Sequence, residues 1–192
     1  MPTLRDGTTP MLAHGSIYLR AAERADIPLF VAWFNDYATS RTLSIRAPMS
    51  SASEEQWFEH ALADQGKSGY HFVACLIGDD RPIGTIGFFD LDHVNGSAAL
   101  GLSIGSAPDR GKGHGSAMIE ALLRFGFASL RLERIELDCY DFNADAHRLY
   151  QRLGFVDEGV ARHRVFREGR HVDLFKMSML AGEWRATRGS ES

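Results

Sequence analysis

The stretch "PDRGKGHGSAMIEALLRFGF", residues Pro108–Phe127, places three glycines and two basic residues before an apolar segment with helical periodicity. Capping alone does not explain these glycines, because Ser, Asp or Asn caps a helix better. Gly111, Gly113 and Gly115 instead leave the backbone N–H groups open to close approach by another molecule. Because a helix start also carries a partial positive charge, the stretch predicts a site for an anionic ligand group.

Length and composition predict one globular domain without nucleic-acid or membrane partners. A chain of 192 residues buries roughly 70% of its unfolded surface and needs no metal to fold. Its net charge of −4 excludes non-specific nucleic-acid binding, which requires a basic face. No signal-peptide core or long apolar run occurs, so we expect a soluble cytoplasmic protein.

Cysteine and histidine usage points away from disulfides and metals. Cys75 and Cys139 each lie in an apolar run, as expected for reduced core thiols. The eight histidines show no H-x-x-x-H spacing and the cysteines no C-x-x-C spacing, so no metal site is predicted. An acyl-cysteine intermediate on Cys139 is the less favoured alternative to a buried thiol.

Periodicity and turn residues predict the element order β-α-α-β-β-β-α-β-α-β-β. Three strand-like runs form a meander, followed by a long helix and a buried strand, which implies one parallel crossover in a mostly antiparallel sheet. We expect the domain to span residues 16–180, with a flexible tail at 1–15 and a C-terminal tail at 181–192. Expected helix caps are Asp26, Asn143, and a capping box formed by Ser53 and Gln56.

The glycine stretch fits neither common nucleotide-binding loop. A Walker loop needs G-x-x-x-x-G-K-[ST], but Gly113 stands where its hydroxyl residue should be. The Rossmann pattern G-x-G-x-x-G is also missed, because the spacing here is G-x-G-x-G. A flexible loop without a ligand remains a weaker alternative, since it leaves the glycines at a helix start unexplained.

Two motifs together resemble the GNAT acyltransferases. "RGKGHG" matches the family's R/Q-x-x-G-x-G/A pattern at Arg110, Gly113 and Gly115. "NADAHRLYQRLGF" resembles its N-x-x-A-x-x-x-Y-x-x-x-GF segment, and both chain ends resemble the ribosomal-protein N-terminal acetyltransferase branch. The resemblance implies an α/β (α+β) single domain whose mixed, mostly antiparallel sheet has about seven strands and about four flanking helices.

The resemblance also implies acetyl-CoA as co-substrate and a set of site residues. The strand before the loop would pair with the pantetheine arm, and the Ile104 N–H would serve as the oxyanion donor. The loop would bind the pyrophosphate, with Arg110 and Lys112 free to add charge or to remain solvated. The implied cofactor-binding residues are Leu102, Ser103, Ile104, Arg110, Gly111, Lys112, Gly113, His114, Gly115, Ser116, Asn143 and Tyr150.

By its family position Tyr150 would be the acid that protonates the departing thiolate. It lies seven residues after Asn143, about two helical turns, so both side chains would face the cofactor. Packing under the sheet is the alternative role for Tyr150, and helix capping is an additional role for Asn143. The catalytic set implied is therefore Tyr150 with Ile104.

The general base is missing from its expected place. Many relatives carry Glu in the strand before the loop, where this chain has Ala99. The nearest substitutes are Asp90, Asp92 and His93, which also read as turn residues. At pH 7 deprotonating a lysine-like amine costs about 4.6 kcal/mol and an α-amine about 1.4 kcal/mol. The missing carboxylate therefore favours an α-amine acceptor.

Acetyl transfer to a primary amine is the leading function, with direct attack in a ternary complex. A peptide or protein N-terminal α-amine is the favoured acceptor, and a small-molecule amine is the alternative. Arg41 and Arg46 lie in the loop that would line the acceptor cavity, where they would bind an acidic group or remain solvated. The rival function is a non-catalytic acyl-CoA sensor, and a homodimer is left open.

Overall fold

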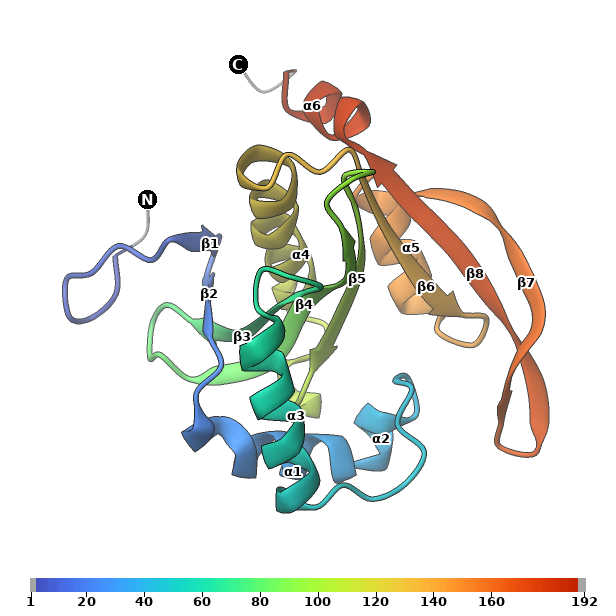
Figure 1. The fold of residues 1–192 in the computed structure, drawn as a ribbon, viewed down its shortest axis with the longest axis horizontal. Coiled ribbons are helices and arrows are strands. Elements are labelled where there is room, and N and C mark those ends of the chain that lie inside the picture. Colours follow the sequence, from blue (N-terminus) through green and yellow to red (C-terminus); the bar gives the residue numbers. More distant parts are fainter. Residues whose placement is uncertain (1–2, 190–192) are drawn as a thin grey trace.

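Within residues 3–189, which the computed structural model describes, one sheet of eight strands forms the scaffold (Figure 1). Its strand order is β1-β2-β3-β4-β5-β6-β8-β7. The strands are β1 Leu12–His14, β2 Ile17–Ala21, β3 Tyr70–Leu76, β4 Pro82–Asp92, β5 Ser97–Ile104, β6 Arg134–Tyr140, β7 Val156–Arg167 and β8 Arg170–Leu180.

Six α-helices accompany the sheet in the described part of the chain. None of them is both long and apolar enough to cross a membrane. Short 3-10 turns precede two of the helices, and a π-helical turn at Phe125–Ser129 extends α4. The helices are α1 Ile27–Asn35, α2 Tyr37–Ser40, α3 Ser51–Asp64, α4 His114–Arg124, α5 Ala144–Arg152 and α6 Ala181–Gly189.

The predicted meander and parallel crossover are both confirmed. Strands β3, β4 and β5 pair antiparallel in chain order, and β5 then pairs parallel with β6. The chain reaches β6 through α4, the crossover helix that begins at the glycine loop. The C-terminal strands β7 and β8 form the expected hairpin. The α/β class with a mixed, mostly antiparallel sheet is therefore confirmed.

Helices cover both faces of the sheet. On β3, Phe72 and Ala74 belong to the main core with α4, whereas Val73 and Cys75 pack with α1. This alternation follows from the period of two in a strand. Because α4 and α1 lie on opposite faces, a molecule held between β5 and β6 is accessible to residues from both faces of the sheet.

The structure has more elements than the expected seven strands and four helices. The segments expected to be tails, 1–15 and 181–192, contain β1 and α6 within the described residues. A strand of three residues is too short to show alternation in the sequence. Helix α6 is anchored by Trp184, whose ring lies 5.3 Å from that of Phe127. Helix α2 occupies part of the segment expected to be a loop.

Asp26 and Asn143 occupy the predicted N-cap positions of α1 and α5 without side-chain capping bonds to those helices, and the predicted box of Ser53 and Gln56 is wrong. Helix α3 is capped by Ser50 and Ser53, whose backbone N–H groups each donate to the other's hydroxyl, at 2.9 and 3.1 Å. The Asp26 side chain makes no capping bond to α1, because Arg20 binds both of its oxygens at 2.7 Å and the Glu23 N–H of the preceding turn donates to one of them at 2.9 Å. Asn143 stands at the start of α5 without a side-chain capping bond. Competing side-chain partners thus decide which polar residue serves as a cap.

Candidate active site

Strands β5 and β6 separate partway along their length. Their parallel pairing ends at Ala99, opposite Glu136, whereas β5 stays paired with β4 as far as Ile104. The Gly105 N–H donates to the Ile83 carbonyl of β4 at 2.9 Å. Since successive residues of an antiparallel strand alternate in direction, the Leu102 and Ile104 N–H groups point toward the opening. An unpaired backbone edge therefore lines the gap between the two strands.

The glycine loop gives the next helix a bare start. Gly111 and Gly113 have φ of +73° and +82°, and an added Cβ at either would meet nothing within 4 Å. Gly113 is the N-cap of α4, which has no side-chain capping bond. Glycine is thus required by the backbone conformation, and it also leaves open space before the N–H groups. This loop fits a phosphate group.

Between the loop, β5 and α5 lies the glycine-side cleft, with a volume of about 630 Å³. It is lined by ten of the predicted site residues and by two arginines of α5 that sequence reasoning missed, Arg148 and Arg152. Their spacing of four residues puts both arginines on one exposed face of the helix, and this pattern could have identified them from the sequence. The predicted residues are Leu102, Ser103, Ile104, Arg110, Gly111, Gly113, Gly115, Ser116, Asn143 and Tyr150.

Three basic side chains of the loop have different positions. The Arg110 guanidinium donates to the Thr39 hydroxyl at 2.6 Å and to the Ile104 carbonyl at 3.3 Å. It therefore ties the loop to α2 and to the end of β5. Lys112 and His114 line a separate depression beside Asp109 and do not line the glycine-side cleft. The loop presents its backbone to the cleft more than its charged side chains.

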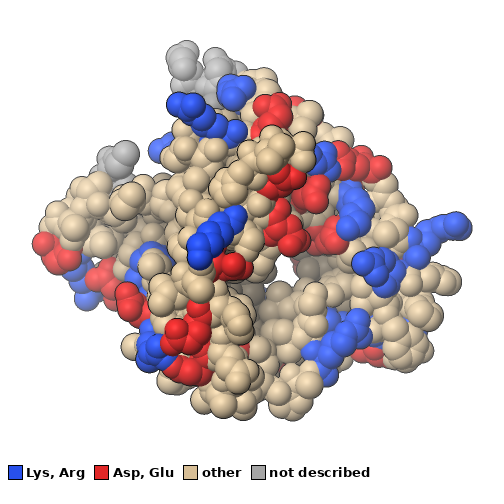
Figure 2. All heavy atoms as spheres, viewed as in Figure 1, with Lys and Arg blue, Asp and Glu red and all other residues tan. Residues whose placement is uncertain are grey.

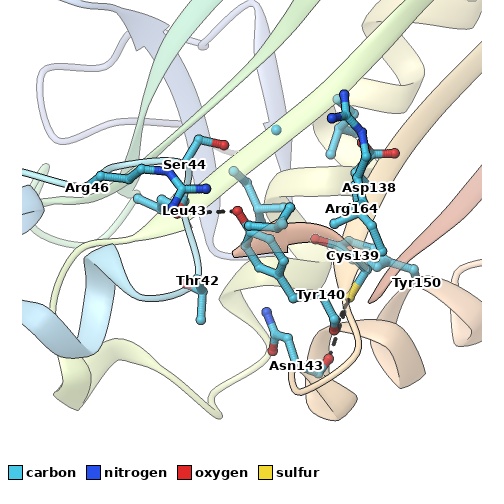
Figure 3. A pocket seen from close by; sticks show the side chains of 15 residues that line it. Thr42, Leu43, Ser44, Arg46, Asp138, Cys139, Tyr140, Asn143, Tyr150 and Arg164 are labelled. Atoms are coloured by element: carbon cyan, nitrogen blue, oxygen red, sulfur yellow. Dashed lines mark hydrogen bonds between the residues drawn. The ribbon is translucent and has the colours of Figure 1, made fainter. Parts of the chain in front are cut away.

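Tyr150 stands where the cleft meets a second space, the central cavity, of about 440 Å³. Figure 3 shows this cavity between β6 and the loop that carries Thr42, Leu43 and Ser44. Tyr150 is 8% exposed, and burial raises the pKa of its phenol well above the ordinary value. The hydroxyl is therefore protonated at neutral pH and available as a donor.

Cys139 also lines the central cavity but is held as a thiol. Burial raises its pKa to about 11. Its Sγ lies 3.6 Å from the Asn143 carbonyl and 3.7 Å from that of Tyr140 (Figure 3). A thiol with this pKa is almost entirely protonated at pH 7, so its environment disfavours a nucleophilic thiolate.

A third space, the aromatic cavity, lies on the α1 and α3 side of the sheet and has a volume of about 470 Å³. Gly101 and Ser103 of β5 line it, and Ala99 shares their face because the strand period is two. Ala99 therefore faces the side from which the expected carboxylate would act. Glu54 of α3 lines the same cavity and is 1% exposed.

Sequence reasoning missed Glu54. The sequence pattern that could have identified it is its spacing: Glu54 stands three residues before Trp57 and four before Phe58, so all three side chains lie on one face of the helix. Trp57 lines the cavity and Phe58 is buried, so a carboxylate among them is buried too.

The substitutes proposed for the base lie at the end of β4 and in the turn that follows it. Asp92 accepts hydrogen bonds from the backbone of Val94 and Asn95 at 2.8 and 2.9 Å, which lower its pKa. Asp90 has φ of +49°, and His93 lies 3.0 Å from the Lys67 carbonyl. None of the three lines the cleft or the two cavities.

Arg41 and Arg46, which were predicted to line the acceptor cavity, both contact the C-terminal hairpin. Arg46 donates to the Phe166 carbonyl at 2.6 Å and also lines the central cavity. Arg41 forms an ion pair with Glu168 at 3.6 Å and lies over the Phe142 ring. In Figure 2 a hollow opens near the centre of the surface, between the α1–α3 side and the β6–β8 side.

A bare helix start at one end of a cleft and unpaired strand backbone along its wall suit a long anionic thioester. They define a CoA-dependent acyltransferase. The chain belongs to the GNAT acetyltransferase family, because the model of the acetyltransferase (GNAT) domain matches residues 16–156. It is an N-acetyltransferase, and acetyl-CoA is the acetyl donor in this family.

Relatives agree with this membership. An SPbeta prophage-derived uncharacterized N-acetyltransferase, YokL of Bacillus subtilis, is 31% identical over 91% of this chain and 95% of its own length. The putative ribosomal N-acetyltransferase YdaF of Bacillus subtilis is 32% identical over 60% of this chain and 62% of its own. The crystal structure of spermidine N-acetyltransferase from Vibrio cholerae in complex with CoA and spermine matches this chain with a TM-score of 0.83 and 25% sequence identity. The match covers 88% of this chain and 98% of that one.

Proposed function

We propose that this enzyme transfers the acetyl group of acetyl-CoA to a primary amine by direct attack in a ternary complex. One observation carries the proposal: Leu102 lines the glycine-side cleft, the central cavity and the aromatic cavity alike. A donor in the cleft and an acceptor in the aromatic cavity therefore meet at the same point of β5. No acyl-enzyme is required, in keeping with the protonated state of Cys139.

The donor is held mainly by backbone groups. The pyrophosphate lies at the N–H groups of Gly111 to Gly115, supported by the positive φ angles of Gly111 and Gly113 and by the uncapped start of α4. The pantetheine arm follows the unpaired edge of β5. The Ile104 N–H, directed into the opening, donates to the thioester oxygen as negative charge develops there.

Tyr150 protonates the departing sulfur. Its place at the junction of cleft and central cavity supports this role. Burial makes the phenolate costly, so proton donation to sulfur must be coupled to return of a proton from the attacking nitrogen. The net result is one proton moved from nitrogen to sulfur through the hydroxyl. Asn143 stands at the start of the same helix and also lines the cleft.

The acceptor is a primary amine of low pKa, with a peptide or protein α-amine favoured over a lysine side chain. At pH 7 an α-amine loses its proton for about 1.4 kcal/mol, against about 4.6 kcal/mol for a lysine-like amine. The absence of a carboxylate at Ala99 supports this preference. A small-molecule amine is the alternative, and a solved relative bound to spermine shows that the family includes such enzymes.

Thiol release from acetyl-CoA tests the proposal. The acceptors are two matched peptides, one with a free N-terminus and blocked lysines, the other with the reverse. We expect thiol release that depends on the acceptor and favours the free N-terminus at neutral pH. CoA binding without release of thiol for any amine would contradict acetyl transfer, and preference for the lysine peptide would contradict the α-amine.

A further inference from the structure

Glu54 is a buried carboxylate that the fold itself leaves without a partner. It is 1% exposed, and neither Oε1 nor Oε2 has a hydrogen-bond partner among residues 3–189. Its backbone N–H is satisfied by the Ser50 carbonyl at 3.0 Å, so only the side chain is unpaired. Such a group is costly unless a ligand completes its hydrogen bonds.

The carboxylate borders empty space, since it lines the aromatic cavity. Four aromatic side chains, from α1, α3 and β4, line it: Phe30, Phe34, Trp57 and Phe89. Aromatic faces attract cations as well as apolar groups. The wall therefore suits a ligand that is cationic at one point and apolar around it.

No side chain of the cavity wall supplies a positive charge to pair with Glu54. The lining contains neither lysine nor arginine. Its one histidine, His71, is enclosed by the Trp57 and Phe89 rings, with centroids at 5.5 and 5.1 Å. Burial lowers the pKa of His71, so this imidazole is neutral. A cation that pairs with Glu54 must come from a bound molecule.

The cavity also reaches the reacting strand. Gly101, Leu102 and Ser103 of β5 form part of the same lining as Glu54. A bound amine therefore lies between the carboxylate and the β5 edge along which the thioester is proposed to run. Glu54 thus places a carboxylate from helix α3 on the sheet face where Ala99 stands in place of the expected Glu.

We propose that Glu54 binds the amino group of the acceptor and is its general base, and that the acceptor is a monoamine whose amino group is attached to a compact apolar group. This inference rests on the proposed acetyl transfer but not on a low pKa of the acceptor, because Glu54 takes up the proton that the amine must lose. A single carboxylate in the lining matches one ammonium group, whereas the further ammonium groups of a polyamine would find no second carboxylate there. The amine belongs to a free apolar amine or to a peptide whose first residue is apolar.

The proton movements balance. Glu54 takes one proton from the ammonium and later releases it to solvent. The freed lone pair forms the C–N bond as the C–S bond breaks, and the electron pair leaves on sulfur. Tyr150 passes a proton to that sulfur and is restored by the second proton from nitrogen.

The test compares Glu54→Gln with Glu55→Gln in the full chain. Glu55 is the adjacent carboxylate of α3, but it is half-buried, pairs with Arg24 and does not line the cavity. Acceptors are phenethylamine, a peptide beginning with phenylalanine and lacking lysine, and spermidine. Glu54→Gln should lower kcat/KM for the phenylalanine-type acceptors by at least about 100-fold, as for loss of a general base, with an unchanged Kd for CoA. Glu55→Gln should match the parent.

Each outcome decides the inference. A parent that prefers spermidine, or a Glu54→Gln variant with parental kcat/KM, would overturn it while leaving acetyl transfer intact. Glu54→Asp, which keeps the charge, should retain more activity than Glu54→Gln, and equal loss in both would also overturn it. No turnover of any of the three amines despite CoA binding would overturn the proposed function as well. Preference between the free amine and the peptide identifies the source of the acceptor.

Discussion

Replacing Gly113 with alanine tests the glycine loop as a phosphate site, because its effects on folding and on binding are separable. Gly113 has φ of +82°, and an added Cβ would meet no atom within 4 Å. The left-handed conformation disfavours an L-residue by about 1–2 kcal/mol. At about 2–4 °C per kcal/mol for a chain of this size, the Tm should fall by roughly 2–8 °C.

Binding should weaken independently, because the new methyl group occupies open space in the glycine-side cleft. Displacing the phosphate from one N–H removes a hydrogen bond to a charged group, about 1.5–3 kcal/mol. The Kd for CoA, measured by titration calorimetry on the folded variant, should therefore rise about 10- to 150-fold.

Gly169→Ala is the matched control. Gly169 has φ of +77°, with nothing within 4 Å of an added Cβ, and it lies in the turn between β7 and β8. It should lose similar stability and bind CoA as the parent does. Equal CoA affinity in both variants and the parent would refute the reasoning.

Three further predictions concern Tyr150, Cys139 and Glu158. Tyr150→Phe should lower kcat by about 100-fold with little change in the Kd for CoA; parental turnover would show that another group protonates the sulfur. Cys139→Ala should keep kcat within a few fold in the same assay, because the raised pKa of about 11 disfavours a thiolate, and loss of turnover in a folded variant would indicate an acyl-cysteine. Hydrogen bonds from Arg134 and Ser178 lower the pKa of Glu158 from 4.5 to about 2, so its contribution to stability is full above about pH 4.5 and is lost as the pH falls toward 2. Glu158→Gln should flatten the decline of unfolding free energy across that range in urea titrations, and an unchanged decline would contradict this.

Much of the donor side could be predicted from the sequence, because local backbone requirements determine it. The alternate glycines indicated a bare helix start, and two of them, Gly111 and Gly113, have positive φ. The meander and crossover followed from strand-like runs around one long helix. Local patterns of this kind need no long-range partner to be interpreted.

The acceptor side could not be predicted in the same way. Glu54 shares the cavity with residues of β3, β4 and β5, and only the packing of α3 on that sheet face brings them together. Arg110 fitted a phosphate-binding role, whereas its closest partner is the Thr39 hydroxyl, 71 residues away in the chain. Side-chain partners far apart in the chain decide these roles.

Mass spectrometry of an acceptor after incubation with isotope-labelled acetyl-CoA tests acetyl transfer most directly. The acceptor is a peptide with an apolar first residue, a free N-terminus and no lysine, and a second sample has its N-terminus blocked. We predict that the first peptide gains one labelled acetyl group on its α-nitrogen and that the blocked peptide gains none. Label that remains in acetyl-CoA, or that appears only as free acetate, would contradict acetyl transfer to such an amine.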